Sequence, residues 1–278
     1  MIILCANTLT PSAKKIQSTS EGVELNWQIN YLANFHLLSI LSPALRAQPP
    51  DRDVRILFGT CSSYMGGDLL HITQKEKEKG KALEPTKFSP GNAYATSKLA
   101  LTTFALAFQK HLSSYNRPDK APMNTKVLLV DPGLSRTPGT RRWITQGSLL
   151  GLLLYLLTYP LWLLALKAPE MGAQSFLHAS MEEAYTRSEG GLLIKECQER
   201  EFLRKDVQDE EAQKKLWEYS EQMVQEAEKR GAEARTKAKK EDAEKKDEEE
   251  AIRQMNEYKD KVGKKEKKEG SRRSKKAG

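Results

Sequence analysis

The sequence predicts an α/β fold with helices on both faces of a doubly wound parallel sheet, followed by a charged helical or disordered tail. Four short apolar runs have the length and composition of buried strands, at 2–5, 54–59, 126–130 and 191–194. Helix-like segments separate them, over about 21–41 (ended by Pro43), 94–112 and 170–180. Short apolar strands between helices are typical of a parallel sheet that is covered on both faces.

The length, the cysteines and the lack of certain motifs exclude several classes of protein. The 278 residues allow one domain or two, with enough chain for a sizeable core. Cys5, Cys61 and Cys197 are odd in number and far apart, which excludes a disulfide framework and suits a reducing compartment. There is no His-Glu-x-x-His pair and no Cys-x-x-Cys knuckle, so no metal site is predicted. Met1 is followed by only three apolar residues, so we expect no secretory signal.

Composition divides the chain into three parts. Residues 1–204 look globular, and residues 205–227 look like one amphipathic helix. In residues 228–278, 32 of 51 side chains are charged, which predicts a solvated helix or a disordered tail. The net charge is +8, but residues 261–278 alone contribute +7, so the rest of the chain is nearly neutral. Its surface therefore gives no reason to expect nucleic acid as a partner.

An uncharged apolar segment covers residues 144–166 and includes eleven leucines. Its length reaches the threshold for a membrane span, and Trp143 and Trp162 are of a kind that favours bilayer interfaces. Pro160 should interrupt the helix there. We expect contact with a membrane surface, through a bent hairpin or one leaflet rather than a straight span. The hairpin is favoured because strands that belong to one sheet lie on both sides of the segment. The alternative is a fully buried core helix.

The strongest local motif is Tyr94-Ala-Thr-Ser-Lys98. Residues four apart lie on one face of a helix. An ammonium group beside a phenol favours phenolate and lowers its pKa, which makes the tyrosine a better acid and base near neutral pH. The spacing alone is common on surface helices, where it has no role.

The surrounding motifs resemble the short-chain dehydrogenase/reductase family, in its retinol-dehydrogenase-like branch, over roughly residues 2–225. Asn92–Ala100 resembles the active-site helix, and Arg55–Ser63 resembles the strand that ends in the catalytic serine. Leu25–Phe35 resembles the helix with the catalytic asparagine, and Val130–Thr137 resembles the Pro-Gly segment beside the nicotinamide. Leu216-Trp-Glu-Tyr-Ser resembles the closing helix of that branch.

The resemblance implies a role for each matching residue. Tyr94 would exchange the proton with the substrate oxygen, and Lys98 would lower its pKa and hold the nicotinamide ribose. Ser62 would hydrogen-bond the substrate oxygen, although an ungapped alignment puts Cys61 there and Ser63 also follows. We prefer Ser62, because a thiol is a poor donor. Asn30 would anchor a water in the proton relay. The remaining residues implied to line the cofactor site are Pro132, Gly133 and Thr137.

Three features depart from the family pattern. The family's Asn-Ala-Gly stands here as Cys5-Ala6-Asn7, and Lys75–Lys81 looks like a solvated insertion. No Gly-x-x-x-Gly-x-Gly turn, on which the family binds the dinucleotide pyrophosphate, occurs in the chain. The chain begins at what resembles the fourth strand, so the resemblance implies an incomplete Rossmann-like sheet. We favour an incomplete gene model over a truncated product as the explanation.

These observations predict an NAD(P)-dependent oxidoreductase that interconverts a carbonyl and an alcohol on a lipophilic substrate. The cofactor would be NADP or NAD, with NADP preferred on the resemblance alone. The alternative is a catalytically inactive product that acts as a membrane-attached interaction protein. We expect the cytosolic face of the endoplasmic reticulum or a lipid droplet as the location, since Lys275-Lys276 near the C-terminus resembles a dilysine retrieval signal. A homodimer is left open.

Overall fold

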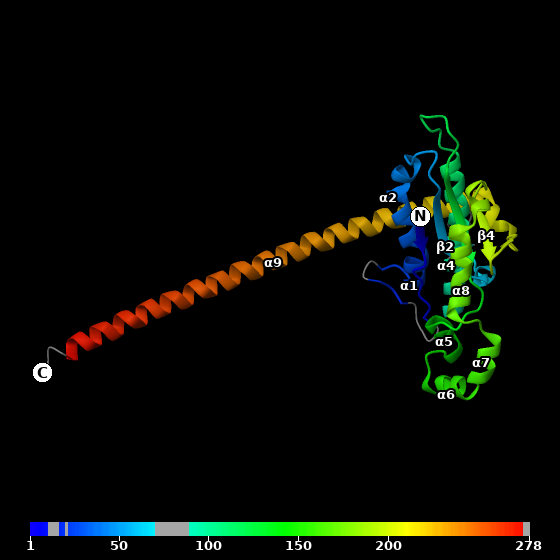
Figure 1. The fold of residues 1–278 in the computed structure, drawn as a ribbon. Coiled ribbons are helices and arrows are strands. Elements are labelled where there is room, and N and C mark those ends of the chain that lie inside the picture. The colour runs from blue at the N-terminus through cyan, green and yellow to red at the C-terminus, as the bar shows by residue number, and fades with distance from the viewer. Residues whose placement is uncertain (11–16, 20–21, 70–88, 275–278) are drawn as a thin grey trace, which may run out of the picture. The chain divides into compact units, whose positions relative to one another are not determined.

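The computed structural model describes residues 1–10, 17–19, 22–69 and 89–274. Its sheet has five strands in the order β1-β2-β3-β4-β5 (Figure 1). The strands are β1 (Ile2–Leu4), β2 (Val54–Gly59), β3 (Thr125–Asp131), β4 (Leu192–Lys195) and β5 (Gln198–Arg200). β1 to β4 are parallel, as predicted. β5 is antiparallel to β4 and was not predicted, because its three residues are all exposed and polar.

Helices lie on both faces of the sheet, which confirms the α/β class. The main ones are α2 (Ala33–Arg46), α4 (Pro90–Ser113), α8 (Pro169–Met181) and α9 (Glu210–Ser274). Side chains of β2 and β3 alternate between two cores, since Ile56 and Val127 pack in the cluster with α2 and α4. Leu57 and Leu128 pack in the other, beneath α8. Every residue of β2 before Gly59 is buried, as expected for a strand covered on both faces.

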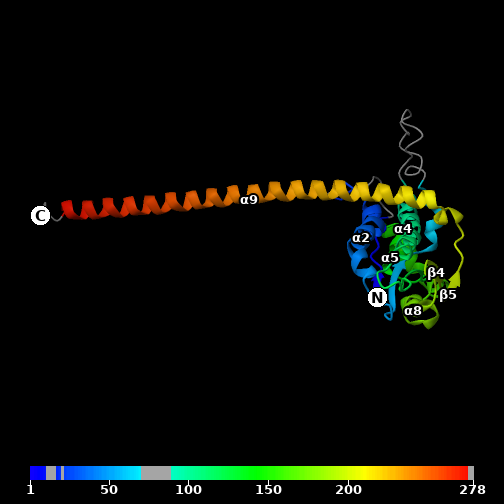
Figure 2. The ribbon, with the colours of Figure 1, turned by 90° about the horizontal axis from the view of Figure 1, so that it is seen from above.

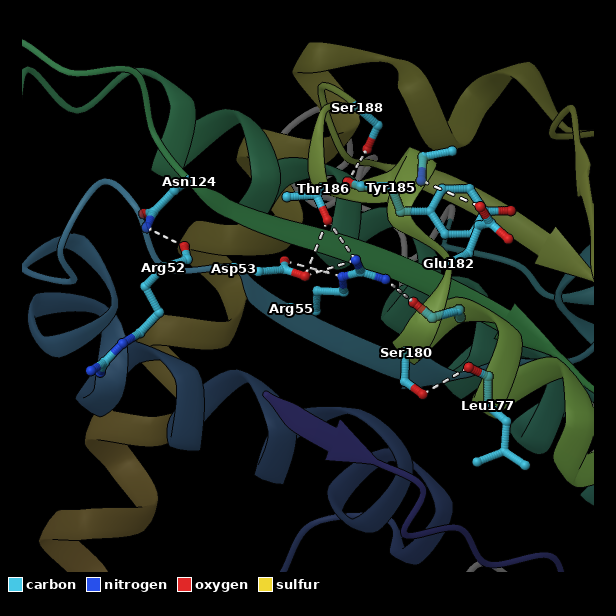
Figure 3. Close-up of polar contacts among 12 residues, drawn as sticks. Arg52, Asp53, Arg55, Asn124, Leu177, Ser180, Glu182, Tyr185, Thr186 and Ser188 are labelled. Atoms are coloured by element: carbon cyan, nitrogen blue, oxygen red, sulfur yellow. Dashed lines mark hydrogen bonds and ion pairs between the residues drawn. The ribbon is translucent and has the colours of Figure 1, made fainter.

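A buried arginine joins β2 to the end of α8 (Figure 3). Arg55 is 3% exposed and forms an ion pair of 2.7 Å with Asp53. Its guanidinium also donates to the Ala179 carbonyl at 2.9 Å and to the Thr186 hydroxyl at 2.7 Å. Thr186 belongs to the short helix η3 (Glu183–Thr186). Three groups therefore share the charge of one arginine, as a buried guanidinium requires.

The helix predicted over 21–41 is not one regular α-helix. It starts as α1 (Leu25–Trp27), widens into a π-helical turn η1 (Gln28–Leu32) and continues as α2. The expected end at Pro43 was wrong, because α2 contains Pro43 and runs to Arg46. Pro43 lies in the last turn, where the missing N–H deprives only the Ser39 carbonyl of its helical partner. Ser39 is exposed, so water can satisfy that carbonyl.

The apolar segment 144–166 folds as short helices. Residues before it form α5 (Pro138–Thr145), and the segment itself forms α6 (Leu149–Leu157) and α7 (Tyr159–Ala165). Pro160 lies in the first turn of α7, so the interruption predicted there is observed. Figure 1 shows α5, α6 and α7 together beyond the carboxyl ends of the strands. Within the described part of the chain, no helix is long and apolar enough to cross a membrane.

The first residues of α9 pack on the body, as the resemblance to a closing helix implied. α9 follows the short turn η4 (Lys205–Gln208) and passes α2 and α4 (Figure 2). Leu216 is 1% exposed, and Trp217 contacts Phe35, Phe104 and Phe108 at ring-centroid distances of 5.4, 5.7 and 6.4 Å. The Tyr31 and Ser220 hydroxyls lie 2.5 Å apart in the same interface.

By its contacts the chain separates into Met1–Val224 and Gln225–Gly278. The second unit is the remainder of α9 and is helical as far as Ser274. The division into 1–204, 205–227 and 228–278 remains a prediction in its detail. The predicted insertion at Lys75–Lys81 and the Lys275-Lys276 pair lie outside the described residues.

Candidate active site

The candidate site lies where the carboxyl ends of β1 and β2 meet the first turns of α4. Parallel strands end at one edge of a sheet, and open α/β sheets bind ligands there. β1 and β2 pair Leu4 with Phe58, so the residues that follow each strand emerge side by side. Ser89 precedes α4 with extended backbone and Pro90 fixes its first turn, which starts the helix close to Tyr94.

The Tyr94 hydroxyl has one partner from each of these two strand ends. Asn7 Nδ2 donates to it at 3.3 Å, and Cys61 Sγ lies 3.4 Å away, where either group can donate. Asn7 was not predicted as a site residue. The departure from the family's Asn-Ala-Gly at Cys5-Ala6-Asn7 was the one sign of it in the sequence.

Burial raises the pKa of the Tyr94 phenol above its ordinary value, and the Cys61 thiol adds to the rise. The hydrogen bond from Asn7 acts in the opposite direction. The lowering expected from Lys98 is not observed. The reason is geometric, because Lys98 Nζ donates to the Gly59 carbonyl at 3.0 Å and lies 5.8 Å from the centre of the Tyr94 ring.

Lys98 is one turn along α4 from Tyr94 and is 3% exposed. Burial lowers the pKa of its ammonium group, while Cys61, Cys5 and Asp131 act to raise it. Cys61 follows β2, Cys5 follows β1, and Asp131 is the last residue of β3. Lys98 is thus enclosed by the carboxyl ends of three neighbouring strands.

Asn30 lies in the π-helical turn and is fully buried. Its side-chain oxygen accepts from the Thr8 N–H at 2.7 Å, and its amide donates to the Thr8 carbonyl and the Ser97 hydroxyl, both at 3.0 Å. The side chain therefore ties the loop after β1 to the residue before Lys98. The backbone carbonyl accepts from Asn34 Nδ2 at 2.9 Å. Both side-chain amide protons are already used, so a water predicted at Asn30 would have to be held by this carbonyl.

Ser62 is held by a different set of partners. Its hydroxyl donates to Asp131 Oδ2 at 2.8 Å and accepts from Lys195 Nζ at 2.8 Å. Asp131 is 4% exposed and forms an ion pair of 3.8 Å with Lys195. Ser62 thus joins β2 to β3 and β4, while Cys61 is the residue beside Tyr94. Ser63 is exposed.

The predicted Pro-Gly segment follows β3 directly. Gly133 has a φ of +73°, and a Cβ there would lie 2.3 Å from Glu196 Oε1, so glycine is required. The Gly133 N–H donates to Asp131 Oδ1 at 2.9 Å. Thr137 is exposed and caps α5, where its hydroxyl accepts from the Thr140 N–H at 3.2 Å. Pro132 is partly buried beside them.

Comparison with known proteins gives relatives of one kind. The chain is 40% identical to "Uncharacterized oxidoreductase pbr1" of Schizosaccharomyces pombe, over 82% of this chain and 60% of that protein. It is 36% identical to "Uncharacterized oxidoreductase YNL181W" of Saccharomyces cerevisiae, over 78% and 54%. It is 30% identical to polyprenol dehydrogenase of Mus musculus, over 72% and 53%. No family model matches the chain.

A solved structure supports the fold alone. It is an uncharacterized protein from Mycobacterium paratuberculosis, 18% identical, with a TM-score of 0.50 over 80% of this chain and 66% of that one. The chain spans little more than half the length of the curated relatives it matches.

The residues present fit one end of a nicotinamide dinucleotide. Lys98 and Tyr94 supply donors for a ribose at the carboxyl edge of the strands, which is where such sheets bind dinucleotides. The 278-residue sequence contains no glycine-rich turn for the pyrophosphate. The order of the motifs, the parallel sheet and the relatives agree, and the chain belongs to the short-chain dehydrogenase/reductase family, in its retinol-dehydrogenase-like branch.

Proposed function

We propose that the protein is an NAD(P)-dependent oxidoreductase that interconverts a carbonyl and an alcohol on a lipophilic substrate. The observation that carries this proposal is the Tyr94 hydroxyl, which lies between Asn7 and Cys61 at the carboxyl edge of the sheet, one helical turn from a buried lysine. A phenol with two hydrogen-bond partners in a partly buried site is placed to exchange a proton with a substrate oxygen.

Each side chain then has a defined task. Tyr94 gives its proton to the substrate oxygen in reduction and recovers it in oxidation. The Lys98 ammonium, held by the Gly59 carbonyl, has two further N–H groups for a ribose. Asn30 orients this part of α4 through Ser97 and offers its carbonyl to a relay water. The nicotinamide, when bound, donates or accepts the hydride.

We revise the sequence-based preference for Ser62 as the residue that hydrogen-bonds the substrate oxygen. We assign this role to Cys61, because its Sγ lies beside the Tyr94 hydroxyl while the Ser62 hydroxyl is engaged by Asp131 and Lys195. A thiol is a weaker donor than a hydroxyl, so its contribution is smaller than a serine would make.

Two observations support a lipophilic substrate. Relatives carry the names polyprenol dehydrogenase and retinol dehydrogenase, both of which denote long apolar alcohols. In addition, the leucine-rich helices α6 and α7 come after the Pro-Gly segment and α5, beyond the carboxyl edge of the strands at which the candidate site lies (Figure 1). NADP(H) is preferred over NAD(H) on the family resemblance alone.

The test is turnover of retinol and of a polyprenol with NADP⁺ or NAD⁺, followed by product chromatography. Both this chain and a form extended by any in-frame upstream coding sequence should be assayed. Oxidation of either alcohol, lost in Tyr94→Phe, supports the proposal. Cofactor binding without turnover of any apolar alcohol or aldehyde would contradict it.

A second candidate is a catalytically inactive product that acts as a membrane-attached interaction protein. It requires a protein that has no glycine-rich turn for the dinucleotide. The genomic sequence upstream of Met1 discriminates between the two. An in-frame strand followed by a glycine-rich turn supports the enzyme, and a stop codon without one supports the interaction protein.

We also propose that the protein works at the cytosolic face of the endoplasmic reticulum or at a lipid droplet. The leucine-rich helices support membrane contact, and the basic residues of 261–278 would add attraction to anionic lipid. Deleting 228–278 should alter the distribution in cells and leave specific activity unchanged. An unchanged distribution would show that the tail has no part in location.

A further inference from the structure

The leucine side chains of α6 and α7 lie on the outside of the protein. Ten of the eleven leucines between 144 and 166 are exposed, and Leu166 alone is buried. The exposed fraction reaches 86% at Leu149 and 88% at Leu164. Among the residues of the two helices, only Tyr155 is buried. The alternative that this segment is a core helix is therefore wrong, and an exposed apolar area of this kind marks an interaction surface.

The two helices hold their own shape without burying those leucines. Tyr155 stacks on Trp162 with an interplanar angle of 15°, and Trp162 Nε1 donates to the Thr158 hydroxyl at 2.8 Å. Gly151 lets α6 approach the end of α5, because a Cβ there would lie 2.2 Å from the Thr145 carbonyl oxygen. Tyr155 thus faces inward and the leucines outward, the reverse of a helix built for a protein core.

Backbone hydrogen bonds join the two ends of the segment that contains α5, α6 and α7. The Arg136 N–H donates to the Lys167 carbonyl at 2.9 Å, and the Lys167 N–H donates to the Leu134 carbonyl at 3.1 Å. The Lys167 ammonium also pairs with Glu196 at 2.7 Å, which fixes the exit to the turn between β4 and β5. Both ends are therefore attached to the same side of the folded body.

The charged residues that flank the leucines in the sequence are all positive. Arg136, Arg141, Arg142 and Lys167 flank the leucines, and no acidic residue occurs between Asp131 and Glu170. Trp143, which follows Arg142, and Tyr159, at the start of α7, are exposed, and such aromatic side chains favour a bilayer interface. A second copy docked on this surface about a two-fold axis would bring two such sets of cations together. Anionic headgroups would instead complement them.

We infer that α6 and α7 insert their leucines into one leaflet of an anionic phospholipid membrane, with Arg136, Arg141 and Arg142 at the headgroups. Each buried CH₂ contributes about 0.8 kcal/mol, and stable attachment needs two signals, which the exposed leucines and the flanking arginines together supply. The inference does not depend on the proposed activity, since binding to vesicles is measured without turnover.

The experiment is sedimentation of the whole chain with vesicles of phosphatidylcholine, alone or mixed with phosphatidylserine. Leu153→Glu/Leu157→Glu changes two exposed leucines of α6 and should lower the partition coefficient about tenfold or more on both vesicles. Ile40→Glu/Leu203→Glu, at exposed apolar positions outside the segment, is the matched control and should bind like the wild type. Arg141→Gln/Arg142→Gln should weaken the preference for phosphatidylserine and keep binding to phosphatidylcholine.

Three results would overturn the inference. The first is a wild-type chain that binds neither vesicle. The second is equal binding of the leucine variant and the wild type, which would assign attachment to the basic tail. The third is a lipid-free wild-type dimer that the leucine variant converts to a monomer, which would make the surface an interface between copies. Thermal unfolding of each variant by circular dichroism verifies that it is folded.

Discussion

The thiol of Cys61 and the hydroxyl of Tyr94 lie 3.4 Å apart, at the ends of β2 and of the first turn of α4. The neighbouring Ser62 is the better hydrogen-bond donor, but its hydroxyl is oriented between Asp131 and Lys195. The position of each residue after β2 therefore decides which side chain faces the tyrosine. The sequence-based preference for Ser62 depended on donor strength, which does not decide it.

Substitutions at 61 and 62 should separate these assignments. In the active enzyme, Cys61→Ala should lower kcat about tenfold, since one weak donor is lost, and Cys61→Ser should equal or exceed the wild type. Ser62→Ala should keep kcat within about threefold and lower the melting temperature, because Asp131 and Lys195 lose a shared partner. Steady-state kinetics and thermal unfolding measure the two effects. Loss of turnover in Ser62→Ala, with normal turnover in Cys61→Ala, would restore Ser62.

Removal of the Tyr94 hydroxyl should abolish turnover. Tyr94→Phe keeps the ring and removes the proton donor, so kcat should fall by about 10²–10⁴ while the Kd for the cofactor changes little. Isothermal titration gives the Kd, and a turnover assay gives kcat. Tyr115→Phe, at an exposed tyrosine beyond the end of α4, is the matched control. Wild-type turnover in Tyr94→Phe would refute the proton-donor assignment.

Strands and helices of the body could be predicted because their apolar patterns are strong. β2 was predicted at its observed bounds, and β3 and α8 within one residue at each end, since Pro132 and Pro169 mark boundaries. The π-helical turn at 28–32 could not be predicted. It depends on Asn30 bonding to Thr8 and Ser97, which are far away in the sequence. Pro43 misled for a similar reason, since tertiary packing holds its helix as far as Arg46.

The candidate site was predictable as a set of residues but not as a set of contacts. Tyr94 and Lys98 share a helix, so their spacing alone places them one turn apart. Asn7 reaches the same hydroxyl only because β1 pairs with β2, which no local pattern encodes. The direction of the Tyr94 pKa shift was also missed. It depends on where the Lys98 ammonium points and on how deeply the phenol is buried.

Loss of the buried arginine should destabilise the body. Arg55→Ala removes the bonds to Asp53, Ala179 and Thr186 and leaves a cavity, so the free energy of unfolding should fall by about 2–3 kcal/mol. Urea unfolding followed by circular dichroism measures it. Arg187→Ala, whose side chain is 84% exposed in its pair with Glu183, should change stability by less than about 0.5 kcal/mol. Equal effects of the two variants would show that the buried network adds no stability.

The docking of α9 should depend on Trp217. Trp217→Ala removes ring contacts with Phe35, Phe104 and Phe108, so unfolding free energy should fall by about 3 kcal/mol. Faster proteolysis after residue 208 would show that the helix has detached. Lys214→Ala, at an exposed position on the same helix, should leave both readouts unchanged. A stable Trp217→Ala variant with unaltered proteolysis would mean that α9 is not needed to cover α2 and α4.

His111 should make this docking weaker in acid. Its ring lies 5.2 Å from that of Trp217 and stacks on Phe108. Burial lowers the pKa of His111 below its ordinary value of 6.5, the positive charge of Arg46 adds to the effect, and Glu221 opposes it. Below pH 6.5 the unfolded chain therefore binds a proton that the folded chain does not, so this group's contribution to stability is lost as pH falls.

The measurement is urea unfolding followed by tryptophan fluorescence from about pH 8 to about pH 5. His111→Gln cannot titrate and should show a shallower loss of stability below pH 6.5 than the wild type. It should also lose some stability at all pH values, because the Ser42 contact and the stacking on Phe108 change. Identical slopes for the two proteins would exclude His111 as the titrating group, since the imidazole is the titratable group that the substitution removes.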